Sequence, residues 1–140
     1  MKNLIAPHAS ETLKPLFVND SSERDAILEQ SRSMSQLLLN SAAAANTVML
    51  GAGYFTPLNG FMNKKDAISV ANNMVTTDGL FWPVPIINLT TDIGSIKEGD
   101  EIALLDPNVD GTPVMATQVI ESIEVITDSE ILNLAEKIFG

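Results

Sequence analysis

The stretch EIALLDPNVDGTPVMATQVIESIEVI, residues 101–126, decides the fold class. Apolar and β-branched residues predict two strands in it, Glu101–Leu105 and Val114–Ile126. The intervening residues Asp106–Pro113 are rich in Asp, Asn, Gly and Pro, which favour turns. Two strands joined by such a loop predict a β-hairpin, so strands dominate the second half of the chain.

A helix follows the hairpin directly. Thr127 and Glu130 have the spacing of a capping box, in which each side chain accepts a hydrogen bond from the other residue's backbone N–H. Gly140 stands at a C-cap position. Helical spacing gives this segment one apolar stripe, made of Ile131, Leu134, Ala135 and Ile138.

Three more helices are predicted before the hairpin. The first covers Ser22–Arg32, and either Asp20 or Ser22 can accept a free amide at its start. The second is capped by Ser41 and ends at Gly51–Gly53, and the third begins near Asn63. Ala26, Ile27 and Leu28 give the first helix a narrow apolar face, and Ala45, Val48 and Met49 lie together at helical spacing in the second. The expected core face of the third helix consists of Ala67, Val70, Ala71, Met74 and Val75.

Two other segments are expected to be extended. Leu37–Leu39 predicts a short buried strand. Residues 80–89 are apolar, but Pro83 and Pro85 exclude a helix and favour an edge strand or an extended segment. The sum of these elements is one α+β domain over residues 1–140, with its helices concentrated in the N-terminal half.

Composition and charge limit the function classes. Of 140 residues, 45% are hydrophobic and 19% are charged, which favours a globular domain over a disordered chain. Eight Lys and Arg against 18 Asp and Glu give a net charge of −10, and only Lys64 and Lys65 are adjacent basic residues. Binding to nucleic acid or to an anionic membrane needs clustered basic residues, so neither is expected.

The compartment is expected to be the cytoplasm. The chain has no cysteine, which fits a reducing environment and excludes thiolate metal sites and cysteine catalysis. Residues 1–8 contain no apolar stretch of signal-peptide length. Residues 33–63 carry no charge, but polar residues, glycines and Pro57 interrupt them, so a buried segment is favoured over a membrane span.

The loop that begins at Asp106 is a candidate calcium site. Asp106, Asn108, Asp110 and Gly111 occupy positions 1, 3, 5 and 6 of an EF-hand pattern. Position 12, which should be a bidentate glutamate, is Thr117, and strands instead of helices flank the loop. A hairpin turn is therefore favoured over a calcium site.

The other candidates for chemistry also favour a structural role. His8 is the only histidine and is expected on the surface, and Gly51–Gly53 is expected to end a helix because the third glycine of a nucleotide-binding fingerprint is missing. Trp82, in an aromatic and proline cluster, is expected in the core. The carboxylates Glu98, Asp100, Glu101, Glu121 and Glu124 are expected in solvent. No residue is therefore assigned as catalytic, cofactor-binding or metal-binding.

Three strings resemble a known family, in the family's order. They are YFTPLNGFM at 54–62, DGLFWPVPI at 78–86 and GDEIALLDP at 99–107, and they are similar to the N-terminal domain of ATP sulfurylase, or sulfate adenylyltransferase. The ending AEKIFG at 135–140 resembles the passage toward that family's catalytic domain. The SAAAAN segment at 41–46 is similar to the dissimilatory forms.

The resemblance implies a PUA-like, β-barrel-type domain of an enzyme that joins ATP and sulfate into adenylyl sulfate and pyrophosphate, and that runs backward in sulfur oxidation. It also implies ATP and Mg²⁺ as ligands of the full-length enzyme, a homo-oligomer, and the catalytic domain of the same polypeptide as partner. The family's Gln-x-Arg-Asn-Pro-x-His-x-x-His and Gly-Arg-Asp segments do not occur here, so the chain is expected to lack the catalytic domain and to be inactive alone. The alternatives are a free-standing PUA-like module that binds RNA and a calcium-binding module at Asp106.

Overall fold

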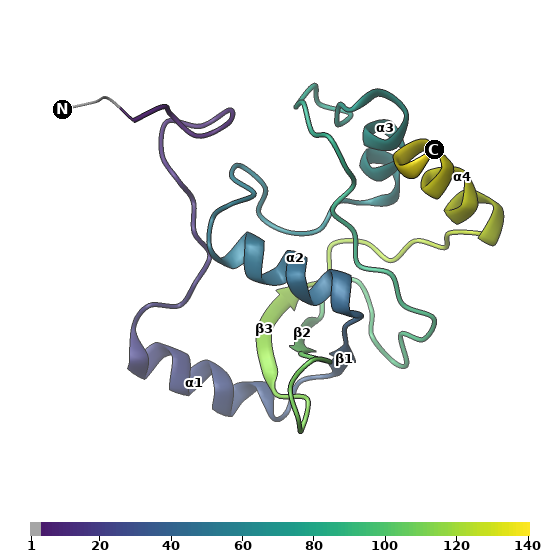
Figure 1. Cartoon of the computed structure of the whole chain (residues 1–140). Helices are drawn as coiled ribbons and strands as arrows, with labels where there is room; N and C mark the ends of the chain where they lie inside the picture. The colour runs from purple at the N-terminus through teal and green to yellow at the C-terminus, as the bar shows by residue number, and fades with distance from the viewer. Residues whose placement is uncertain (1–3) are drawn as a thin grey trace. The chain divides into compact units, whose positions relative to one another are not determined.

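The computed structural model describes residues 4–140. The prediction that residues 1–8 contain no export signal therefore lies partly outside the described residues. The described chain forms two compact units (Figure 1). The first unit consists of residues up to Gly60 together with Asn88–Glu121, and the second of Phe61–Ile87 together with Ser122–Gly140. No helix in the described part of the chain is long and apolar enough to cross a membrane.

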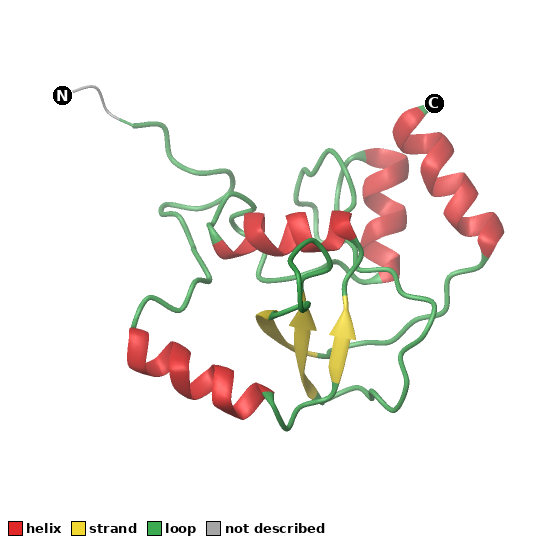
Figure 2. Ribbon diagram, turned by 60° about the horizontal axis from the view of Figure 1, so that its bottom comes forward, coloured by secondary structure: helices red, strands yellow, loops and turns green. Residues whose placement is uncertain are grey.

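The first unit contains a three-stranded sheet of β1 (Gln36–Leu38), β2 (Glu101–Leu105) and β3 (Val114–Val119), in the order β1-β2-β3 (Figure 2). β1 pairs with β2 in parallel, with Leu37 opposite Leu104. β2 and β3 form the predicted antiparallel hairpin, with Ile102 opposite Gln118. The α+β class is confirmed, but the sheet is open instead of closing into the barrel that the resemblance implies.

The central position of β2 accounts for its apolar sequence. Ile102 and Ala103 are fully buried and Leu104 is almost so, and since successive side chains of a strand point to opposite faces, β2 is covered on both faces. The bounds of β2 agree with the prediction, whereas β3 ends at Val119 instead of Ile126. Val119 pairs with Glu101, the first residue of β2, and Ile120 still exchanges backbone hydrogen bonds with Asp100 and Gly99, which precede that strand.

β1 differs from its predicted form. It covers Gln36–Leu38 instead of Leu37–Leu39, and it is not buried, because Leu38 is 54% exposed. Leu39 follows the strand and supplies the buried side chain. As an edge strand, β1 has a partner on one side only, so part of its surface stays open to solvent.

Two helices complete the first unit. α1 (Ser21–Ser31) lies against β3, and the Asp20 carboxylate caps it by accepting the Glu23 N–H at 2.8 Å. α2 (Ser41–Gly51) runs beside the sheet in Figures 1 and 2. The predicted cap of α2 was wrong by one residue, because the Asn40 side chain, and not Ser41, accepts the Ala43 N–H at 2.8 Å.

The apolar residues grouped by spacing in α2 do not form its buried face. Ala43, Ala44 and Leu50 are buried, while Ala45 and Val48 are exposed. A run of alanines is apolar in every direction, so the helical period does not distinguish one face from another.

The second unit packs α3 (Lys64–Asn73) against α4 (Asp128–Phe139). The Asn63 side chain caps α3, and Ala67 and Val70 are buried as predicted. Met74, which was expected in the core, is 54% exposed, because it ends the helix in a left-handed conformation with φ of +56°. In α4 the predicted Thr127–Glu130 capping box and the Gly140 C-cap are both present.

Candidate functional site

The loop between β2 and β3 forms the hairpin connection that was favoured over a calcium site. The Asp106 N–H donates to the Pro113 carbonyl at 2.9 Å, and the Asp106 carboxylate accepts the Asn108 N–H at 2.8 Å. The Asn108 side chain in turn accepts the Ser41 hydroxyl at 2.9 Å, which ties the loop to the start of α2. Within residues 4–140, no three histidine or acidic side chains are grouped so that they could hold a metal ion.

His8 and the glycine pair have the structural positions that the sequence predicts. His8 is exposed, and α2 ends at Gly51 with Ala52 as its C-cap. Sequence reasoning missed the close approach of the N-terminal segment at this point. A Cβ at Gly53 would lie 3.0 Å from the backbone nitrogen of Pro15, and the Leu16 N–H donates to the Gly51 carbonyl at 2.9 Å.

Trp82 is a core residue of the second unit, as predicted. It is 7% exposed, and its backbone N–H donates to the Met74 carbonyl at 2.9 Å. The residues around it form an extended segment and not a strand, since Phe81 makes only an isolated bridge with Val75. Trp82 therefore packs within the unit instead of forming a ligand platform.

The turn before Trp82 is held by a buried threonine. The Thr76 side chain donates to the Asp78 carboxylate and accepts the Leu80 N–H at 3.0 Å. The hydrogen bond from Thr76 holds the pKa of Asp78 below its usual value. These bonds fold residues 76–80 tightly and give them a structural role.

The carboxylates expected in solvent are exposed, except that of Asp100, which is half-buried. Glu121 is exposed and Asp100 accepts the Lys97 N–H at 2.9 Å in a turn, as expected for surface residues. Glu124 is exposed as predicted, but it also has a role that the sequence did not indicate, because its carboxylate accepts the backbone N–H of Lys64 at 2.7 Å. It thus binds one of the free amides at the start of α3, where a negative charge is favourable.

Lys64 and Glu130 join the two helices of the second unit. The Lys64 ammonium lies 2.9 Å from the Glu130 carboxylate and donates to the Val125 carbonyl at 2.8 Å. The Thr127 backbone N–H also donates to Glu130, at 2.8 Å. Hydrogen bonds from the Thr127 backbone and from Lys64 lower the pKa of Glu130 from 4.5 to about 2. Sequence reasoning found the capping box but missed Lys64, which is distant in the chain.

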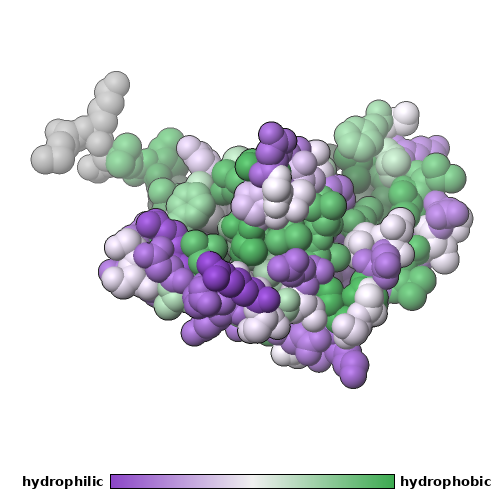
Figure 3. All heavy atoms as spheres, turned by 90° about the horizontal axis from the view of Figure 1, so that it is seen from below, coloured by the Kyte–Doolittle hydropathy of each residue, from purple (hydrophilic) through white to green (hydrophobic). Residues whose placement is uncertain are grey.

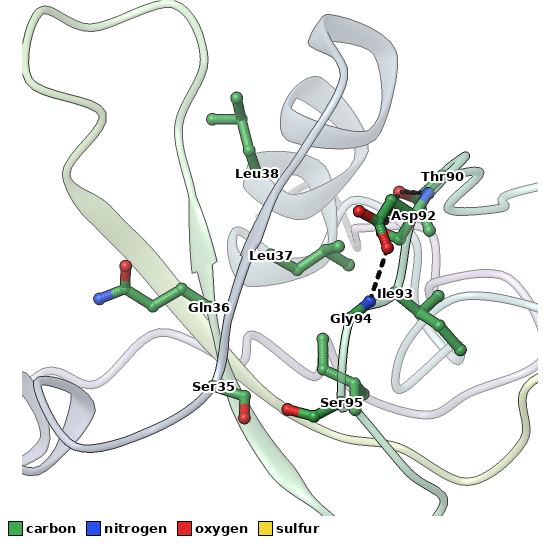
Figure 4. Close-up of a pocket in the computed structure, with 10 residues that line it drawn as sticks. Ser35, Gln36, Leu37, Leu38, Thr90, Asp92, Ile93, Gly94 and Ser95 are labelled. Atoms are coloured by element: carbon green, nitrogen blue, oxygen red, sulfur yellow. Dashed lines mark hydrogen bonds between the residues drawn. The ribbon is translucent and has the colours of Figure 1, made fainter.

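A hollow in the first unit lies beside the free edge of β1. Its volume is about 470 Å³, and it is bounded by Ser35–Leu38 and by residues of the segment 90–96. Figure 4 shows the Leu37 side chain pointing toward the Asp92–Gly94 turn, while Gln36 and Leu38 point away from it. The Asp92 carboxylate accepts the Gly94 N–H at 2.8 Å and so shapes this turn.

The lining of this hollow does not suit ATP with Mg²⁺. A triphosphate needs cationic groups or several free N–H groups around it, and Mg²⁺ needs carboxylate oxygens together with the phosphates. None of the lining residues is basic, and the one carboxylate, that of Asp92, already accepts a backbone N–H. We therefore assign no step of nucleotide chemistry to this hollow.

Comparison with known proteins agrees with the resemblance seen in the sequence. A family model described as a PUA-like domain matches residues 5–139. The sulfate adenylyltransferase of Alcanivorax borkumensis is 48% identical over all 140 residues, and that of Allochromatium vinosum is 41% identical over 137 residues. The chain spans only 35% and 34% of the lengths of these relatives.

A solved structure gives the same result for the fold. The hexameric APS kinase from Thiobacillus denitrificans matches with a TM-score of 0.71 at 29% identity, covering 91% of this chain and 24% of that one. The sequence match, the family model and the structural match each extend over nearly all of the described residues. The chain therefore belongs to the PUA-like domain family, in the form that occurs in sulfate adenylyltransferases.

Proposed function

We propose that this chain is the N-terminal, non-catalytic domain of a sulfate adenylyltransferase. The observation that carries the proposal is the 48% identity over the entire chain to a protein of which the chain spans only 35%. Because one family model matches residues 5–139, we treat residues 1–140 as a single domain. The rest of such an enzyme then supplies the catalytic domain and is the partner of this one.

The charge of the chain supports the proposal that its domain is not the catalytic one. Joining ATP to sulfate brings two anions together, so the reacting site needs positive charge to stabilise them. This chain has 8 basic residues against 18 acidic ones, and no basic residue lines the hollow beside β1. We therefore place the binding of ATP, Mg²⁺ and sulfate in the part of the enzyme that this chain does not include.

The proposal extends to assembly and compartment. The related APS kinase of known structure is hexameric, which supports a homo-oligomeric full-length enzyme. The lack of cysteine supports a cytoplasmic enzyme, because cytoplasmic proteins do not rely on disulfides. The direction of the reaction in sulfur oxidation, adenylyl sulfate to ATP, stays a prediction.

Two measurements test the proposed function. The isolated chain is expected to show no exchange between ATP and sulfate, because it lacks the charged site. A chimera in which this chain replaces the matching 35% of the Alcanivorax enzyme is expected to form adenylyl sulfate. The control is the Alcanivorax enzyme with the matching part removed, which we expect to be insoluble or inactive.

Either of two results would overturn the proposal. The first is turnover by the isolated chain that persists through repeated purification. The second is a soluble, folded chimera without activity. A titration of the isolated chain with RNA at low salt tests the alternative function, and saturable binding that weakens as salt is added would favour an RNA-binding module.

A further inference from the structure

Helix α4 has an apolar face wider than its contact with α3 uses. Leu134 is 8% exposed and Ile138 is half-buried, so these two side chains face the interior of the second unit. Leu132 is 70% exposed and Phe139 is 84% exposed on the same helix. One half of the apolar face is therefore buried, and the other half is open.

The open half forms a continuous stripe. Leu132, Ala135 and Phe139 are spaced by three and four residues, so they lie one above another on one side of the helix. All three are exposed, and we call them the outer stripe. Figure 3 shows apolar side chains reaching the surface on the face of the molecule that it draws. Exposed apolar patches of this kind mark surfaces that another chain or domain covers.

The charges beside the outer stripe indicate what kind of surface could cover it. Helical spacing places the acidic residues Asp128 and Glu136 beside the outer stripe, and both are exposed. With a net charge of −10, the chain repels a second copy of itself, so an acidic rim disfavours self-association. The same rim is complementary to a surface that carries lysine and arginine, as a domain that binds ATP and sulfate must.

We propose that the outer stripe is the surface on which the catalytic part of a sulfate adenylyltransferase packs, through an apolar patch edged with basic residues. This inference rests on the proposed function, and it adds the surface that the packing uses. The larger part of the Alcanivorax relative lies outside the match and is available to cover the stripe. The apolar side chains of the stripe provide the buried contact, and the acidic rim sets the orientation.

Single cysteines can test this surface cleanly, because the chain has none of its own. Leu132→Cys and Phe139→Cys place a thiol on the outer stripe, and Asn133→Cys, also exposed on α4 but on another side of the helix, is the matched control. Each variant is modified with a maleimide in the isolated chain and in the chimera with the Alcanivorax enzyme. Modification is followed at the relevant peptide by mass spectrometry, so cysteines elsewhere do not interfere.

The expected result is protection confined to the stripe. In the chimera, both stripe thiols should react at least about tenfold more slowly than in the isolated chain, because a covered thiol reacts only when the contact opens. The Asn133→Cys thiol should react equally fast in both. Equal rates at the stripe in an active chimera would overturn the packing surface and leave the proposed function standing.

Two further outcomes are decided by the same samples. Protection of the stripe already in the isolated chain, with a dimer in sedimentation, would overturn the inference in favour of a second copy. Protection in the isolated chain as a monomer would also overturn it, because the chain itself would then cover the stripe. If one stripe variant does not fold, as judged by circular dichroism, the other still gives the comparison.

Discussion

The side chains of Lys64 and Glu130 meet at 2.9 Å and connect the first turn of α3 to the first turn of α4. Glu130 also accepts hydrogen bonds from the backbone N–H and the hydroxyl of Thr127, at 2.8 and 3.1 Å. One carboxylate thus closes a capping box and anchors a neighbouring helix. Because its partners favour the charged form, its pKa falls from 4.5 to about 2.

Replacement of this carboxylate should destabilise the chain in a pH-dependent way. A pKa that is lower in the folded state than in the unfolded state gives a stabilisation that is complete above about pH 4.5 and is lost as the pH falls through about 2. Glu130→Gln should therefore lower the melting temperature at pH 7, and the difference from the wild type should shrink between pH 5 and pH 3. Thermal unfolding over this range measures the effect.

The matched control for this variant is Glu136→Gln. It removes the same charge from an exposed position of the same helix, so it corrects for the change in net charge. Its melting temperature should follow that of the wild type at each pH. A Glu130→Gln deficit of constant size from pH 7 to pH 3 would contradict the assignment.

Mutation can test whether Asn40, as in the structure, or Ser41, as predicted from the sequence, caps α2. Asn40→Ala removes the acceptor of the Ala43 N–H, and should cost about 1–2 kcal/mol of unfolding free energy, as N-caps do. Ser41→Ala removes only an exposed hydrogen bond to Asn108, and should cost less than about 0.5 kcal/mol. Urea unfolding followed by circular dichroism gives both values. If Ser41→Ala proves the more costly change, the cap is assigned to the wrong residue.

Local signals in the sequence predicted those elements whose causes are local. The capping box of α4 and the Asp20 cap of α1 depend on residues three positions apart, and both are present. The length of β3 depends on where its partner strand begins, which residues 120–126 do not encode. The contact of Lys64 with Glu130 likewise joins residues that only the fold brings together. The function likewise could not be inferred from the residues one by one, because they indicated no active site. The resemblance of whole strings to a known family indicated it instead.

Gly53 and Gly111 both have a positive φ, but only Gly53 also lies close to another part of the backbone. Both have φ of +80°, which an alanine adopts at a cost of about 1–2 kcal/mol. A Cβ at Gly111 meets nothing within 4 Å, whereas one at Gly53 would lie 3.0 and 3.2 Å from backbone atoms of Pro15. Gly53→Ala should therefore destabilise the chain more than Gly111→Ala in urea unfolding.

Hydrogen exchange can show which part of the chain is disturbed by the additional destabilisation in Gly53→Ala. The Leu16 and Phe17 amides donate to the Gly51 carbonyl, at 2.9 and 3.2 Å, and hold the N-terminal segment against the end of α2. They should exchange faster in Gly53→Ala because Pro15 must move, and should be unchanged in Gly111→Ala. Equal exchange at these amides in both variants would show that the close approach to Pro15 is unimportant.

Ile102 should be among the most costly residues to truncate. It is fully buried in β2, the central strand, where removal of side-chain atoms leaves a cavity that neighbouring strands cannot fill. Ile102→Ala should cost about 2–5 kcal/mol of unfolding free energy, and Ile102→Val about 0.5–1.5 kcal/mol. The milder variant keeps the measurement possible if the alanine variant does not fold, because a domain has only about 5–15 kcal/mol in total.

Val119→Ala is the matched control, since it also shortens a β-branched side chain in the same hairpin. Val119 is 58% exposed and ends β3, so truncation there should cost less than about 0.5 kcal/mol. Urea midpoints of the three variants are compared at constant slope. If Val119→Ala costs as much as Ile102→Val, burial at β2 does not dominate the hairpin, and pairing between the two strands must carry the stability instead.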